Sequence, residues 1–266
     1  MVEHCLREAG VEGSNPFTPT IFIIYYFYFL EGLILKPNFS SPDFDLYVLN
    51  LNLINVTDLD YSNYLSPEEF VRFSKIKLES VKKSQMISQG FKRKILGDIL
   101  DQDPRELIFK LGPAGKPYLD LDLNLKTPLF FNLSHAGDFV LLGVSNRSEI
   151  GVDIEKIKNL DYLNLAKRFF HLLEIDFLKQ EKDLKKQERL FFKLWVYKEA
   201  YLKAIGLGIS YGLDRFAIDP NLGVFLQEPQ EREHQGYYLK ELVLNNAYFS
   251  AVCWRPGEDS NLRPTP

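Results

Sequence analysis

The segment Gly151-Val152-Asp153-Ile154-Glu155 places two carboxylates two residues apart in a predicted strand. Because side chains two apart on a strand share a face, Asp153 and Glu155 are expected to point together while Val152 and Ile154 point into the core. Oxygen ligands held this way suit Mg²⁺, which binds one or two carboxylates together with waters and substrate phosphates. The alternative is a strand end with two solvated acids, and the motif alone does not exclude it.

A predicted helix over residues 188–205 carries a further acid, Glu199, one turn away from both Trp195 and Lys203. Glu199 lies near the edge of the apolar stripe, so it can face a neighbouring strand as a third metal ligand or a base, with Lys198 or Lys203 neutralising phosphate. The alternative is that Glu199 and Lys203 form an ordinary i, i+4 surface pair, worth ~0.3–0.5 kcal/mol.

Two further places offer phosphate contacts. Ser134 and His135 precede a predicted strand at 139–145, and we expect them to be displayed at a loop, where binding residues concentrate. Lys116 lies in a Gly-Lys-Pro turn, which presents its ammonium as a point charge. The alternatives are a capped turn with an exposed histidine and an ordinary surface lysine.

The elements that must position these residues follow from local patterns. Ser66-Pro67-Glu68-Glu69 predicts a helix start, with a serine N-cap, an early proline and acids that favour the helix dipole. Helix is expected through 70–84 and 91–100, with Gly90 as a weak point between them, and again over 160–170. The predicted strands are 44–53, 107–111, 139–145, 150–154, and a final hairpin of 237–244 with 248–254. Strands and helices thus occur in the same order twice, which predicts an α+β fold of two similar halves that meet near 146–149.

Composition sets limits on the function. The chain has 266 residues, of which 45% are hydrophobic and 26% charged, and a net charge of −4. These values are typical of a globular protein and give no support for nucleic-acid or membrane-surface binding. Two cysteines near opposite ends predict neither a disulfide framework nor a zinc site, so we expect a cytoplasmic protein. The apolar run 21–30 is too short to span a membrane and lacks the features of a signal peptide.

In their order along the chain, these motifs closely resemble the Sfp-type 4′-phosphopantetheinyl transferases. The resemblance covers residues 44–254, and its paired GVDIE and WxxKEAxxK elements are specific. The matching segments are GKP at 115–117, FNLSH at 131–135, GVDIE at 151–155, RFF at 168–170 and LWVYKEAYLK at 194–203, followed by Gly206.

The resemblance implies two pseudo-symmetric α+β halves with coenzyme A in the cleft between them. It implies that Asp153, Glu155 and Glu199 bind Mg²⁺. The basic and polar positions that it implies around coenzyme A are Arg72, Lys116, Ser134, His135 and Lys203. Three positions depart from the family: Glu69 and Gln89 stand where basic residues are common, and residues 171–174 replace a typical small-residue helix start.

The implied reaction moves the 4′-phosphopantetheine group of coenzyme A to a serine of an apo acyl or peptidyl carrier protein and releases 3′,5′-ADP. Glu199 and Lys203 are the implied catalytic residues, and the sequence leaves open whether Glu199 is a base as well as a metal ligand. The alternatives are a non-catalytic protein that binds coenzyme A or a carrier protein, and a metal-dependent nucleotide pyrophosphatase. We expect a monomer, because one chain supplies both halves of the site.

The expected domain organisation has four parts. Residues 42–147 and 148–255 form the two halves, residues 1–41 form an extension outside the domain, and residues 256–266 form a disordered tail. Both ends contain segments, at 13–16 and 259–262, that the T-arm sequence of transfer-RNA genes would encode. This match indicates an open reading frame that runs through neighbouring genes at both ends.

Overall fold

The first half of the chain forms a four-stranded sheet with helices on its outer face. We describe a computed structural model, in which residues 20–22, 37–53, 60–120 and 128–257 are described. The sheet has the order β2-β3-β7-β6, and β4 pairs with β5 as a separate hairpin. The elements are β2 (Phe39–Ser40), β3 (Asp45–Asn50), α2 (Pro67–Ser74), α3 (Glu79–Leu100), β4 (Phe109–Leu111), β5 (Pro117–Leu119), β6 (Phe130–Ala136) and β7 (Phe139–Ser145).

The second half repeats this plan. Its sheet has the order β1-β11-β12-β8, and β9 pairs with β10. The elements are β8 (Ile150–Lys156), α4 (Tyr162–Phe169), α5 (Leu172–Gln180), α6 (Leu184–Ile205), β9 (Ala217–Ile218), β10 (Phe225–Gln227), β11 (Tyr238–Val243) and β12 (Tyr248–Trp254), and β1 (Thr20–Phe22) pairs in parallel with β11.

The two halves have the same connectivity. In each, a first strand leads through helices and a small hairpin into two antiparallel strands, and the last of these lies between the other two. The predicted α+β class and its two similar halves are therefore confirmed. The segments predicted to lie outside the halves contribute short strands, since Phe39–Ser40 pairs with β3 and Thr20–Phe22 pairs with β11. Our expectations for residues 13–16, 23–30 and 258–266 lie outside the described residues.

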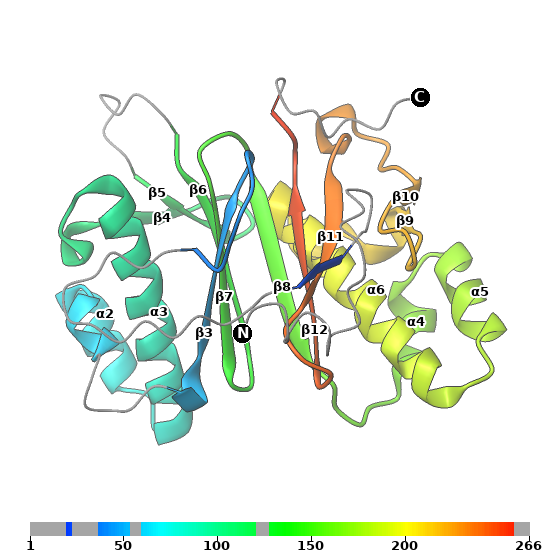
Figure 1. The fold of residues 1–266 in the computed structure, drawn as a ribbon, viewed down its shortest axis with the longest axis horizontal. Coiled ribbons are helices and arrows are strands. Elements are labelled where there is room, and N and C mark those ends of the chain that lie inside the picture. Colours follow the sequence, from blue (N-terminus) through cyan, green and yellow to red (C-terminus); the bar gives the residue numbers. More distant parts are fainter. Residues whose placement is uncertain (1–19, 23–36, 54–59, 121–127, 258–266) are drawn as a thin grey trace, which may run out of the picture.

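The two sheets pack face to face, and the helices cover their outer faces (Figure 1). Alternation along the strands creates this arrangement, because Leu46 and Leu141 point between the sheets whereas Tyr47 and Leu142 point toward α3. The shared core between the sheets also contains Ile150, Val152, Ile154, Val252 and Trp254 from the second half. The halves are thus joined by a common apolar layer, so we expect them to unfold together.

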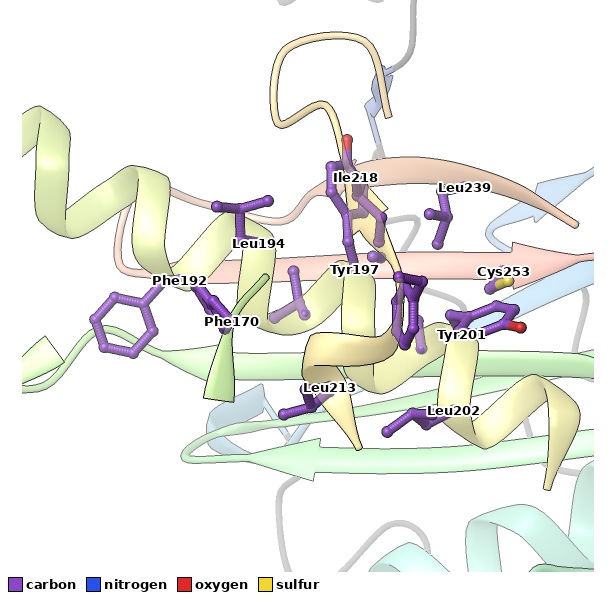
Figure 2. Packing of buried hydrophobic residues seen from close by; sticks show 14 of the residues in the cluster. Phe170, Phe192, Leu194, Tyr197, Tyr201, Leu202, Leu213, Ile218, Leu239 and Cys253 are labelled. Carbon is purple, nitrogen blue, oxygen red and sulfur yellow. The ribbon is translucent and has the colours of Figure 1, made fainter. Parts of the chain in front are cut away.

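The helix α6 forms the centre of the second half. Its side chains Leu194, Tyr197 and Tyr201 are completely buried against strands and shorter helices, as Figure 2 shows. The helix begins at the N-cap Asp183, whose carboxylate accepts hydrogen bonds from two backbone amides, and it ends at Gly206 in the left-handed conformation. This burial on one face holds the opposite, polar edge of α6 in place over β8.

The local predictions need one correction and one extension. The serine N-cap at Ser66 is present as predicted, and Glu69 completes it as a capping box, but α3 runs without interruption through Gly90. A Cβ at Gly90 would lie 1.9 Å from the carbonyl oxygen of Tyr61, so this glycine serves a close backbone approach rather than a helix break. The helix α5 lies at Leu172–Gln180, where the sequence patterns predict neither helix nor strand. None of the helices in the described segments is long and apolar enough to cross a membrane.

Candidate functional site

The strand β8 and the helix α6 bring the predicted acids together. Val152 and Ile154 are buried between the sheets, and Asp153 and Glu155 point to the opposite face, as the strand period predicts. On that face α6 lies very close to β8, because a Cβ at Gly151 would be only 2.0 Å from the carbonyl oxygen of Ala200. The glycine of the motif therefore allows the acids of the strand to meet the polar edge of the helix.

A small network joins Asp153 to the helix and to the first half. The Lys203 ammonium donates to Asp153 Oδ1 at 2.6 Å and to Ser134 Oγ at 3.0 Å. The Ser134 hydroxyl in turn donates to the same Asp153 Oδ1, also at 3.0 Å. Asp153 is only 4% exposed, so this network is largely shielded from water. Both contacts that Asp153 makes in this network use the same oxygen, Oδ1.

Two acidic oxygens of the cluster are left over. Asp153 Oδ2 and Glu199 Oε1 are buried and have no hydrogen-bond partner within the described part of the chain. A buried acceptor without a partner is costly, and such atoms in a folded protein call for an explanation such as a bound ion. Burial, followed by the Asp153 carboxylate, raises the pKa of Glu199 to about 7, although the Lys203 ammonium opposes the shift.

Glu155 is the third acid of the cluster, and it is more exposed to solvent than Asp153. Its carboxylate lies 3.6 Å from the ammonium of Lys158, which is 64% exposed. Burial and then the neighbouring Asp153 raise the pKa of Glu155 above its ordinary value. The Asp153 carboxylate thus contributes to the raised pKa of both Glu155 and Glu199.

The site lies where the two sheets meet along their edges. β6 is the edge strand of one sheet and β8 of the other, and the Asn132 side chain accepts a hydrogen bond from the Val152 amide at 2.8 Å. Ser134 and His135 belong to β6 and not to a loop, which corrects our expectation. The reason is that the strand extends to Ala136 before the turn, so the strand edge, rather than a loop, presents both side chains.

An open pocket of about 340 Å³ surrounds these groups. It is lined by Leu133, Ser134, His135, Asp153, Ile154, Glu155, Trp195, Glu199, Lys203 and Ile209. Sequence reasoning did not assign Trp195 and Ile209 to the site. The position of Trp195 one turn before Glu199 was an available signal, whereas Ile209 follows the end of α6 and carried none. Partial burial, and secondly the Lys203 ammonium, lower the pKa of His135.

Two predicted phosphate contacts lie elsewhere. The Lys116 ammonium pairs with Glu149 and donates to the carbonyl oxygens of Ile150 at 3.2 Å and Ala204 at 2.9 Å. Lys116 thus links the β4–β5 hairpin to the start of β8 and the end of α6, and it does not line the pocket. Arg72 is exposed on α2, with its guanidinium over the neighbouring Phe73 ring.

The two departures from the family pattern on the first helices have partners of their own. Glu69 accepts a hydrogen bond from the buried Arg93, which also donates to two backbone carbonyls. Gln89 accepts a hydrogen bond from the ammonium of the buried Lys92 at 2.6 Å. Both departures therefore belong to buried polar contacts within the first half.

Lys198, which the sequence offers as an alternative to Lys203 for neutralising phosphate, points away from the pocket. Its side chain and that of Glu174 are both 0% exposed, and their charged groups are 2.8 Å apart. The Lys198 ammonium also donates to the carbonyl oxygens of Leu213 and Phe216, at 2.6 and 2.8 Å. All three N–H groups of the ammonium thus have partners inside the protein, and the ammonium is not available to a ligand.

Comparisons with known proteins match nearly the whole described domain. The family model described as "4′-phosphopantetheinyl transferase superfamily" matches residues 149–253, and "4′-phosphopantetheinyl transferase, N-terminal" matches residues 58–147. The chain is 33% identical to 4′-phosphopantetheinyl transferase Sfp of Bacillus subtilis, with 71% of this chain and 87% of that protein covered. It is 37% identical to psf-1 of Bacillus pumilus, over 61% and 67%, and 33% identical to gsp of Aneurinibacillus migulanus, over 65% and 71%.

Proposed function

The chain belongs to the 4′-phosphopantetheinyl transferase superfamily, and on that premise we propose that its pocket is where a carrier-protein serine receives the phosphopantetheine arm of coenzyme A. The observation that supports this assignment most is the pair of buried oxygens without partners, Asp153 Oδ2 and Glu199 Oε1. They lie in a pocket that also holds Lys203. A diphosphate together with a cation would satisfy all three groups.

The residues fit a magnesium ion in donor type. Among the described residues, no three acidic, histidine or cysteine side chains stand as a ready metal site. One oxygen of Asp153 is paired with the Lys203 ammonium. The unpartnered oxygens nevertheless supply the hard donors that Mg²⁺ prefers. Asp153, Glu155 and Glu199 would hold the ion. When bound, it would neutralise charge on the diphosphate as the transition state forms.

Each residue of the pocket then has its own role in the transfer reaction. The serine oxygen bonds to the β-phosphorus of coenzyme A, the bond from that phosphorus to the bridging oxygen breaks, and 3′,5′-ADP leaves. Glu199, which lines the same pocket, takes the proton of the serine hydroxyl directly or through a water. The Lys203 ammonium lies beside the same acids and neutralises charge on the phosphates. We assign Ser134 and His135, at the pocket wall, to coenzyme A phosphates.

The test is incubation of the protein with coenzyme A, Mg²⁺ and an apo carrier protein, followed by intact mass. Transfer adds one phosphopantetheine to the carrier and releases one 3′,5′-ADP. A protein that only binds coenzyme A would leave the carrier unchanged. A nucleotide pyrophosphatase would cleave coenzyme A without the carrier. Either result would overturn the proposal, and the set of carriers accepted would define the pathway served.

We further propose that the active protein is a cytoplasmic monomer. The proposal is supported by the shared core between the sheets, to which both halves contribute from one chain. It is also supported by the contacts of Ser134 in the first half with Asp153 and Lys203 in the second. Light scattering on active protein should give the mass of one chain, and activity confined to a dimer or trimer would contradict this.

A further inference from the structure

The ammonium of Lys203 stands where a cation would be expected. It donates to Asp153 Oδ1 at 2.6 Å, beside the two acidic oxygens that lack partners. The same ammonium is held by Ser134 Oγ at 3.0 Å, which fixes its position from the opposite half. A lysine ammonium and a divalent ion repel each other strongly at such short range, so both do not remain at Asp153 together.

Lys203 is also able to leave this position. It lies in the last turn of α6, three residues before Gly206, and its side chain is 28% exposed in contrast to 6% for Asp153. A lysine head group on a flexible stem can move several ångströms without any change of the backbone. The ammonium therefore has a route from the carboxylate into the open pocket.

We propose that Lys203 is a resident counter-ion that keeps the carboxylate cluster closed to a divalent cation until a diphosphate draws the ammonium away. The proposal rests on the function assigned above, and it adds an order in which the metal and coenzyme A bind. The metal binds weakly to the free protein and tightly together with coenzyme A, because the diphosphate attracts Lys203 and adds its own oxygens to the metal. By linkage, the metal must then raise the affinity for coenzyme A by the same factor.

Lys158 provides a matched control. Its ammonium also faces an acid of the cluster, Glu155, but at 3.6 Å and with 64% of its side chain exposed. Solvent weakens such a contact, so loss of Lys158 should change metal affinity little. Loss of Lys203, whose partner Asp153 is buried, should change it strongly. The two lysines thus separate a specific counter-ion effect from a general change in net charge.

The experiment is calorimetric titration of the full-length protein with Mn²⁺ alone and with Mn²⁺ in the presence of saturating coenzyme A. We expect the wild type to bind Mn²⁺ at least tenfold more tightly with coenzyme A than without it. Lys203→Met should bind Mn²⁺ alone at least tenfold more tightly than the wild type, and coenzyme A should then add little. Lys203→Arg, which keeps the charge, should stay close to the wild type, and Lys158→Met should change the affinity less than threefold.

Asp153→Asn should abolish the tight site, which assigns the titrated site to this cluster. Circular dichroism and a thermal melt check that each variant is folded, and Lys203→Gln replaces Lys203→Met if the latter is not. The proposal is overturned if Lys203→Met binds Mn²⁺ alone no more tightly than the wild type, or if coenzyme A leaves the wild-type affinity unchanged. The carrier-modification assay tests the transferase function separately, so the two claims can fail independently.

Discussion

Two ion pairs anchor the same helix, one fully buried and one at the pocket, and they differ in how completely their polar atoms are satisfied. Lys198 and Glu174 are both inaccessible to solvent, and the Glu174 oxygens also accept hydrogen bonds from the amides of Ile218 and His171. Lys203 and Asp153, five residues further along α6, leave Asp153 Oδ2 without a partner beside Glu199 Oε1. The satisfied pair lies in the core of the second half, whereas the incomplete pair faces the pocket.

The largest expected effect is on activity at the incomplete pair. Asp153→Asn keeps the shape of the side chain but removes its charge, so phosphopantetheine transfer should fall roughly a thousandfold, equivalent to about 4 kcal/mol of barrier. The rate is measured by carrier mass at saturating coenzyme A and Mg²⁺. Urea denaturation of the metal-free variant should show stability close to that of the wild type. Near-normal turnover would show that the carboxylate cluster is not needed for the transfer reaction.

The opposite result is expected at the satisfied pair. Glu174→Gln leaves the Lys198 charge buried with only carbonyl partners, which should lower the free energy of unfolding by about 3 kcal/mol. Folded variant protein should retain most of its transfer rate. The double variant Glu174→Leu with Lys198→Met removes both charges and should lose less stability than the single variant. A double variant that is less stable than Glu174→Gln would contradict this comparison.

A second buried lysine, Lys92, lies between these two cases. The Lys92 ammonium has Gln89 as a hydrogen-bond partner and lies 3.8 Å from the centre of the Phe109 ring. Burial, partly offset by Glu69, lowers the pKa of Lys92 to about 8. The folded state therefore binds a proton less readily than the unfolded state between about pH 8 and the ordinary pKa of lysine, so wild-type stability should rise with pH across that window.

Replacement of this lysine by an apolar residue should stabilise the protein. Lys92→Met should raise the free energy of unfolding by roughly 1–2 kcal/mol at pH 7, because a buried charge is removed and most of the volume is kept. The gain should be complete below about pH 8 and should shrink, and then vanish, as the pH rises toward the ordinary pKa of lysine. Urea titrations at pH 7, 9 and 10.5 measure it. A variant that is less stable at every pH would show that the cation–ring contact outweighs burial.

The smallest expected effect concerns the pocket wall. His135→Ala should raise KM for coenzyme A by roughly three- to tenfold with a smaller change in kcat, because it removes a ground-state contact with a phosphate. Dephospho-coenzyme A, which lacks the 3′-phosphate, should respond little to the substitution. Steady-state rates with both donors decide the point, and equal losses with the two donors would assign His135 a structural role.

The sequence predicted the site best where a short-range period determines which way a side chain points. The alternation around Asp153 and the one-turn spacing of Glu199 and Lys203 needed no tertiary information, and both hold in the structure. The direction of Lys198 could not be predicted in this way, since it depends on α5 supplying Glu174. Similarly, Gly90 resembles a helix break until Tyr61 is seen against it. The errors arise where a distant segment decides the outcome.

The same distinction applies to Lys116. Its Gly-Lys-Pro turn formed as predicted, with Gly115 in the left-handed conformation that glycine favours. Its partners, the Glu149 carboxylate and the carbonyl oxygens of Ile150 and Ala204, all come from the other half of the molecule. No local pattern in the sequence indicates that the hairpin reaches across to the end of α6.

The central claim is that the incomplete pair is where a cation and the diphosphate meet. Anomalous diffraction from crystals grown with Mn²⁺ and coenzyme A tests it most directly. We predict one strong anomalous peak within coordination distance of oxygens of Asp153 and Glu199, with the Lys203 ammonium moved from Asp153 to the diphosphate. Bound coenzyme A with no anomalous peak at these carboxylates, or with Lys203 still on Asp153 beside the metal, would contradict the account.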